Sequence, residues 1–223
     1  MCDETRCARH SRRNFLQTGV SLFALALAAP IRHAVAATAS ATPPVALTPD
    51  QALRRLRDGN ARYAANQLDI KDFSAGRATR AKAQYPIAAI LSCADSRVAP
   101  ELIFDQGPGD LFVIRIAGNY LDIGVLASLE YAVKVLNVPL IMVLGHSDCG
   151  AVKATIGEIK QPSMLPGHIW DITDAVRPGV EKVVGSGGDN LLERAIESNV
   201  DYNVSRIASA QPIMAEAVQH RRL

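Results

Sequence analysis

The sequence predicts an α/β domain with a mainly parallel central sheet that helices cover on both faces. Three short apolar runs carry this prediction, at 87–91, 111–116 and 139–144. Strands that are apolar throughout are typical of parallel sheets, because such strands are buried on both faces. Helical patterns lie between and after these runs, which is the alternation of an α/β fold. A length of 223 residues suits one domain of ordinary size.

The first element of the domain is expected to be a helix that opens at Thr48. Thr48 suits the N-cap position, and Pro49 suits the first helical position, where a missing N–H costs nothing. Gly59 is expected to break the apolar stripe of this helix. The stripe itself consists of residues at helical spacing, namely Ala52, Leu53, Leu56 and Tyr63.

Further helices follow the strands. Residues 123–136 have apolar side chains at positions 125, 126, 129, 132, 133 and 136, which is the spacing of a helix with one broad buried face. Another helix is expected from Ala151 onward. From Trp170 the chain is predicted to be largely helical, most clearly over 190–208 and 211–220.

The composition excludes several classes of protein. Of all residues, 48% are hydrophobic and 21% are charged, which is too apolar for a disordered chain. No stretch of about 18 consecutive apolar residues occurs, which excludes a protein with several membrane spans. The formal net charge is only +2, so the sequence has no electrostatic footprint for nucleic acid.

Residues 1–36 resemble an export signal. A basic start is followed by an uncharged stretch over 19–31 and by Ala34-Val35-Ala36, the order of n-region, h-region and cleavage site. Arg12-Arg13 followed by Asn14-Phe15-Leu16 resembles the twin-arginine class of signals. A membrane anchor is the alternative, but the apolar stretch is short. We therefore expect twin-arginine export to the periplasm or the medium, with no stable membrane span after cleavage.

Removal of residues 1–36 changes both the net charge and the number of cysteines of the chain. Cleavage is expected after Ala36, Ala39 or Ala41, followed by a linker over 37–46 and a domain over 47–223. Without residues 1–36 the net charge is −1. Of the 4 cysteines in the chain, only Cys93 and Cys149 then remain.

These two cysteines lie at strand ends, together with a histidine. Cys93 follows the first predicted strand, and His146 and Cys149 follow the third. Ligands gather at the carboxyl ends of strands in an open parallel sheet. Two thiolates and an imidazole can hold zinc, with water or a carboxylate such as Asp95 as the fourth ligand. The spacing alone equally allows a disulfide or two buried thiols.

Two longer motifs narrow these alternatives. They run over 93–97 (CADSR) and 145–152 (GHSDCGAV), and they resemble the two signature motifs of β-class carbonic anhydrases. The similarity extends over nearly all of residues 47–220. It includes the segments 59–63, 106–115, 117–119 and 129–132.

The resemblance implies a zinc enzyme that interconverts CO2 and bicarbonate. It places Cys93, His146 and Cys149 at the positions of the zinc ligands. It places Asp95 and Arg97 at the positions of the family's Asp–Arg dyad. The family also implies a homodimer or homotetramer.

Two more residues acquire a role through the resemblance. Gln106 matches a residue that helps to hold bicarbonate in the plant-like branch, and the N–H of Gly150 lies where a substrate oxygen would be met. Zinc lowers the pKa of bound water toward about 7, and the resulting hydroxide attacks CO2. Asp95 would close the site as a fourth ligand unless Arg97 drew its carboxylate away, so the dyad is expected to act as a gate.

The resemblance departs at the C-terminus. The family usually continues with a strand and a hairpin after the last helix, whereas this sequence stops at 218–223 as that helix ends. We therefore expect the last strand of the sheet to be missing. Two other functions stay open: hydrolysis of carbonyl sulfide or carbon disulfide on the same scaffold, and a catalytically silent zinc-binding or disulfide-linked interaction domain.

Overall fold

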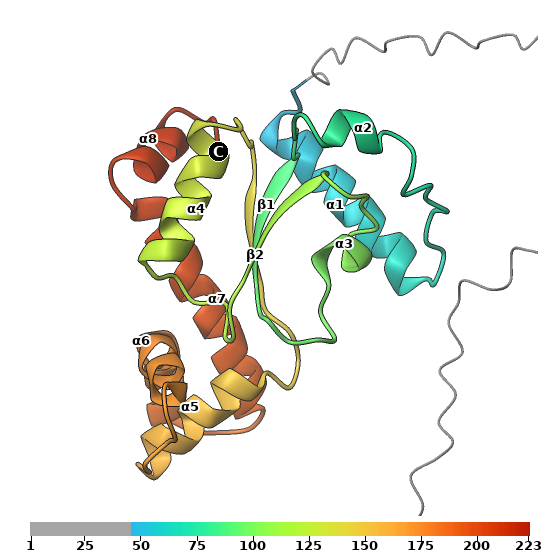
Figure 1. Cartoon of the computed structure of the whole chain (residues 1–223). Coiled ribbons are helices and arrows are strands. Elements are labelled where there is room, and N and C mark those ends of the chain that lie inside the picture. The colour runs from blue at the N-terminus through green and yellow to red at the C-terminus, as the bar shows by residue number, and fades with distance from the viewer. Residues whose placement is uncertain (1–45) are drawn as a thin grey trace, which may run out of the picture. The chain divides into compact units, whose positions relative to one another are not determined.

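The computed structural model describes residues 46–223. The expected signal over 1–36, its cleavage sites and nearly all of the expected linker over 37–46 lie outside the described residues. Within the described part, the strands form one sheet: β1 (Ala88–Ser92), β2 (Leu111–Arg115) and β3 (Ile141–Leu144). The helices of the same part are α1 (Pro49–Ala64), α2 (Arg77–Arg80), α3 (Pro100–Ile103), α4 (Ile123–Lys134), α5 (Gly150–Lys160), α6 (Ile169–Ser186), α7 (Leu191–Ser209) and α8 (Ile213–Gln219) (Figure 1).

The sheet is parallel throughout, with the order β2-β1-β3, and this confirms the predicted fold class. In the register of the sheet, Ser92 of β1 pairs with Arg115 of β2 and with Leu144 of β3. All the strands therefore end at the same edge. β3 begins at Ile141 rather than at Pro139, because proline has no N–H to donate to a strand ladder.

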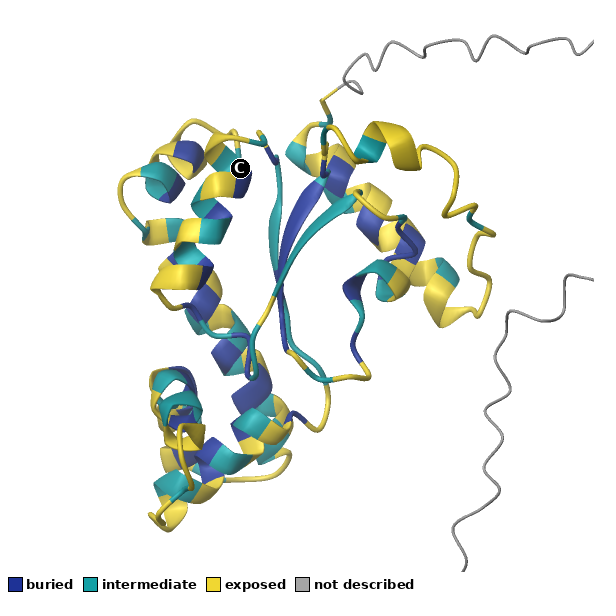
Figure 2. Cartoon of the chain, in the orientation of Figure 1, coloured by how far each residue is buried: buried dark blue, intermediate teal, exposed yellow. Residues whose placement is uncertain are grey.

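Helices cover both faces of the sheet, and the side chains of β1 alternate between two cores (Figures 1 and 2). Ala89 and Leu91 pack in one cluster with side chains of α4, α7 and α8. Ile90 packs on the opposite face with Leu56 of α1 and with Phe104. Every residue of β1 is buried, as expected for a strand inside a parallel sheet, whereas most of β2 and β3 is half-buried.

The opening helix begins where the sequence predicts. The hydroxyl of Thr48 accepts a hydrogen bond from the Gln51 N–H at 3.2 Å, and the Gln51 side chain accepts one from the Thr48 N–H at 2.8 Å, which is a capping box. Gly59 does not break the buried face but belongs to it. A Cβ at Gly59 would lie 1.8 Å from the Phe104 carbonyl oxygen. The missing side chain thus allows α1 to approach the backbone after α3.

The other predicted helices are also present. α4 occupies most of the range expected over 123–136, and α7 and α8 lie within one or two residues of the ranges expected over 190–208 and 211–220. α5 packs against α6, α6 packs against α7, and α7 continues along β3 toward α8 (Figure 1). In the described part of the chain, no helix has the length and hydrophobicity needed to span a bilayer.

Candidate metal centre

The position of Cys93 is set by the ends of two neighbouring strands. Cys93 directly follows β1 and is 4% exposed. Arg115, the last residue of β2, donates from Nε to the Cys93 carbonyl oxygen at 3.0 Å and from Nη2 to the Asp95 carbonyl oxygen at 2.6 Å. This role of Arg115 is not evident from the sequence. Its only signal was a charged residue at the carboxyl end of an otherwise apolar strand.

His146 and Cys149 approach the same place from the end of β3. His146 lies two residues after Leu144, the last residue of β3. Cys149 is the N-cap residue of α5 and is 1% exposed. Between them, Asp148 adopts a φ of 53°, a left-handed conformation that aspartate tolerates better than most residues. A short turn therefore carries both side chains.

The three side chains converge on one point. The candidate ligand atoms of Cys93, His146 and Cys149 all lie within 4.8 Å of one another, and both cysteines are free. The His146 Nδ1 lies 2.9 Å from the Ser147 carbonyl oxygen. Its Nε2 is buried and has no hydrogen-bond partner among the described residues. An unpaired ring nitrogen beside two thiols is a donor set that suits zinc, so the group could hold this metal.

The two thiols are electrostatically coupled. A hydrogen bond from Cys149 lowers the pKa of Cys93 to about 4, and the Gly118 N–H, which donates to Cys93 Sγ at 3.3 Å, acts in the same direction. The same bond raises the pKa of Cys149, and burial raises it further. The pair therefore retains one proton at neutral pH, and a bound metal ion would displace it.

Asp95 and Arg97 form a bidentate pair next to these thiols. Arg97 donates from Nε and Nη2 to the two carboxylate oxygens of Asp95, both at 2.9 Å, and its backbone N–H donates to Oδ1 at 3.0 Å. The guanidinium holds the pKa of Asp95 well below its usual range. Oδ2 of Asp95 lies 3.9 Å from His146 Nε2. The carboxylate thus lies beside the candidate ligands, with both of its oxygens bound by Arg97.

Gly150 also lies at this site, as the first residue of α5 after Cys149. It is exposed, and a Cβ there would meet nothing within 4 Å. The N–H groups of a helix's first turn have no intrahelical acceptor. The Gly150 N–H therefore has no acceptor within α5, next to Cys149.

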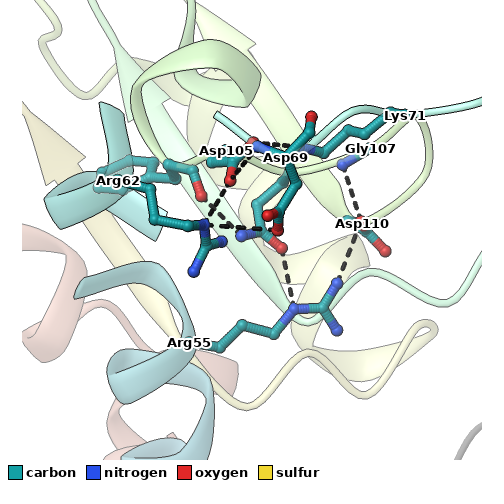
Figure 3. Close-up of polar contacts among 9 residues, drawn as sticks. Arg55, Arg62, Asp69, Lys71, Asp105, Gly107 and Asp110 are labelled. Atoms are coloured by element: carbon teal, nitrogen blue, oxygen red, sulfur yellow. Dashed lines mark hydrogen bonds and ion pairs between the residues drawn. The ribbon is translucent and has the colours of Figure 1, made fainter. Parts of the chain in front are cut away.

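The structure does not bring Gln106 to this group. Gln106 precedes β2, so it lies toward the edge of the sheet where the strands begin. It is 5% exposed, accepts a hydrogen bond from Arg55 Nε at 2.9 Å and donates one to the Phe104 carbonyl oxygen at 2.6 Å. Its surroundings are the ion pairs between α1 and the segment 69–110 (Figure 3). Within this chain, Gln106 connects helices rather than lining the candidate metal centre.

A sequence model of a known family covers the strands and all candidate ligands. The family is described as carbonic anhydrase, and it matches residues 88–223. The chain belongs to the carbonic anhydrase family. The matched range contains β1, β3 and the start of α5, which supply Cys93, His146 and Cys149.

Individual carbonic anhydrases resemble parts of the chain. The carbonic anhydrase of Mycolicibacterium smegmatis is 49% identical over 133 residues, which is 59% of this chain and 65% of that protein. This chain therefore matches slightly less than two thirds of that relative. The structure of the β-carbonic anhydrase CcaA has a TM-score of 0.58 and 30% identity, covering 77% of this chain and 79% of that one. Tetrameric β-carbonic anhydrases of Sordaria macrospora give a TM-score of 0.57 and 26% identity, covering 74% and 83%.

Proposed function

We propose that the chain binds one zinc ion through Cys93, His146 and Cys149 and catalyses the reversible hydration of CO2 to bicarbonate. The convergence of the three ligand atoms within 4.8 Å of one another carries this proposal. Two thiolates and one neutral imidazole are a ligand set of catalytic zinc sites, and these residues would leave the metal room for a water molecule. Membership of the carbonic anhydrase family supports the same reaction.

The chain's own side chains would orient the reactants. Zinc, when bound, supplies a water molecule whose pKa is lowered toward about 7, so that a nucleophile is available near neutral pH. Asp95 is ionised and lies 3.9 Å from His146 Nε2, so it can accept a hydrogen bond from the nucleophile and direct a lone pair toward the carbon of CO2. The Gly150 N–H, which belongs to the first residue of α5 beside Cys149, would donate to a substrate oxygen.

Arg97 would keep the fourth position free. Its guanidinium occupies both oxygens of Asp95 at 2.9 Å. A carboxylate released from this pair could turn toward the metal and complete a four-ligand, closed site. We therefore assign Asp95 and Arg97 the role of a gate, in which the bidentate pair corresponds to the open state.

Zinc analysis and stopped-flow CO2 hydration test the proposed function. The purified chain should contain one equivalent of zinc and hydrate CO2, whereas a Cys149→Ser variant should lose both properties because the site loses a thiolate. A zinc-loaded, folded chain that is silent toward CO2 would contradict the enzyme and favour the interaction domain. Parallel assays with carbonyl sulfide and carbon disulfide separate the alternative substrates.

We also propose that the chain is exported by the twin-arginine pathway and assembles with copies of itself. The Arg12-Arg13 motif and the small residues before position 41 support export. Replacement of both arginines by lysine should then retain the protein in the cytoplasm on fractionation.

A homodimer or homotetramer is supported by two observations: strands β2 and β3 are apolar but only half-buried, and the similar carbonic anhydrases of Sordaria macrospora are tetrameric. Light scattering after size-exclusion chromatography measures the oligomeric state. A monomer would contradict the proposed self-assembly.

A further inference from the structure

The N–H that donates to Cys93 belongs to a tightly packed turn between β2 and α4. Gly118 and Asn119 have φ values of 85° and 39°, so two successive residues are left-handed. A Cβ at Gly118 would lie 2.8 Å from Cγ2 of Val176 in α6 and 3.1 Å from the Cβ of Ala151 in α5. The turn is therefore pressed between Cys93 and the helices, and only glycine fits at its centre.

Two buried asparagines of α7 bind this turn. Asn199 donates from Nδ2 to the Gly118 carbonyl oxygen at 2.9 Å. Asn203 accepts at Oδ1 from the Leu121 N–H at 2.8 Å and donates from Nδ2 to Asn199 Oδ1 at 3.1 Å. Asn199 is 1% exposed and Asn203 is 0% exposed. Buried amides of this kind are stable only when their polar atoms are paired.

The order of donors and acceptors leaves one orientation for each amide. The Leu121 N–H can only donate, so Asn203 must turn its oxygen toward Leu121 and its nitrogen toward Asn199. Asn199 then turns its oxygen toward Asn203 and its nitrogen toward the Gly118 carbonyl, which can only accept. Two backbone groups thus determine which way both side chains point.

We propose that Asn199 is a positioning residue of the metal centre. It holds the Gly118 carbonyl, and the N–H of the same residue donates to Cys93 Sγ at 3.3 Å. Asn199 therefore orients a ligand sulfur through one intervening residue, without touching the metal position itself. Groups that hydrogen-bond to metal ligands typically change metal affinity by about 10–100-fold. This inference rests on the proposed zinc site and adds a residue of α7 to it.

A purely structural role for Asn199 makes a different prediction. Asn199 also packs closely against α6, since a Cβ at Gly179 would lie 2.9 Å from Asn199 Oδ1. If Asn199 served only this packing, a variant would lose stability but release zinc at the normal rate. Metal release therefore distinguishes the two roles, whereas stability alone does not.

The test compares Asn199→Asp with Ile207→Ala. Aspartate keeps the shape and the oxygen that Asn203 binds, but it cannot donate to the Gly118 carbonyl. Ile207 lies eight residues further along the same helix, is 4% exposed and packs in the core cluster with α4 and α8, which contains neither Gly118 nor Cys93. Both variants should unfold more easily. Only Asn199→Asp should release zinc to a chelator about 10-fold faster or more, and only its cobalt-substituted form should show a shifted thiolate-to-cobalt absorption band.

The outcomes separate this inference from the proposed function. Equal zinc release and equal cobalt spectra in Asn199→Asp and the unaltered chain overturn the role of Asn199 and leave the zinc site in place. An unaltered, folded chain that binds no zinc overturns both. If Asn199→Asp does not fold, Asn203→Asp is measured instead. It keeps the acceptor for Leu121 but removes the donor that orients Asn199, so unchanged zinc release in that variant also overturns the inference.

Discussion

Arg97 is a residue at which metal binding and catalysis are expected to separate. In Arg97→Ala, both 2.9 Å side-chain bonds to Asp95 are lost, and the freed carboxylate, whose Oδ2 lies 3.9 Å from His146 Nε2, is expected to turn toward the candidate metal position. We expect zinc content to stay the same while CO2 hydration falls by about 100-fold or more. Zinc analysis and stopped-flow kinetics check this result. Arg222→Ala is a matched control, because it removes an arginine from a surface pair with Glu216; an active Arg97→Ala enzyme contradicts the gate.

Asp105 is a second carboxylate whose neighbours hold it ionised (Figure 3). Its side chain is 1% exposed and accepts hydrogen bonds from Lys71, from Arg62 Nε at 2.6 Å and from the Asp69 N–H at 3.2 Å. Burial alone would raise the pKa of Asp105, but the bonds from Lys71 and Arg62 outweigh it and lower the pKa to about 2. This carboxylate therefore connects α1 to the segment that follows it.

The lowered pKa of Asp105 predicts how stability depends on pH. A carboxyl group with a pKa below the usual value of about 3.9 stabilises the fold fully above that value, and it loses this effect as pH falls through about 2. Asp105→Asn should reduce the free energy of unfolding by about 3 kcal/mol at neutral pH, because two cations lose their buried partner. Urea unfolding should show this difference shrinking as pH falls from about 5 to about 2. The exposed Asp174→Asn variant is the control. The prediction is contradicted if the difference in free energy of unfolding does not change with pH, or if the control loses as much stability as Asp105→Asn.

At the scale of elements, Gly59 determines how closely α1 packs. A Cβ at this position would overlap the Phe104 carbonyl oxygen at 1.8 Å, so Gly59→Ala must push α1 away from the backbone that follows α3. We expect a loss of about 2–3 kcal/mol in the free energy of unfolding. Gly157→Ala is the matched control, because a Cβ at this exposed position of α5 would meet nothing within 4 Å. The free energy of unfolding of Gly157→Ala should rise by about 0.5–1 kcal/mol. Chemical denaturation should therefore show a loss of stability in Gly59→Ala and a gain in Gly157→Ala.

At the scale of the whole molecule, the metal centre joins the sheet to the helices beyond it. Cys93 comes from the end of β1 and Cys149 from the start of α5, and both belong to the core cluster formed with α6 and α7. A ligand that binds only the folded chain stabilises it by about 2.7 kcal/mol at 100 times its Kd. Chelation should then lower the Tm by about 5–10 °C, and zinc should restore it. If the Tm of the unaltered chain does not change with chelator, the proposed zinc site is contradicted. The Cys149→Ser variant is the control, and its Tm should be the same with and without chelator.

Much of this architecture could be predicted from local patterns. Thr48 starts α1 as its position before Pro49 indicates, and three continuous apolar runs become the parallel sheet. Because parallel strands end at one edge, the sequence also predicted that Cys93, His146 and Cys149 would meet. The surroundings of Gln106 could be predicted only in part. Its place before the strand at 111–116 indicates the edge where the strands begin, but its bonds to Arg55 of α1 and to the Phe104 carbonyl oxygen depend on tertiary packing.

Local patterns along the chain are enough to predict the α/β class, the order of the elements and the set of candidate ligands, because these depend on periodicity, on capping residues and on which residue types stand at strand ends. The buried bonds from Asn199 to Gly118 and from Gly118 to Cys93 become apparent only in the folded chain. Such contacts join residues as much as 81 positions apart. Their existence depends on the packing of helices against the sheet, which leaves no periodic trace along the chain.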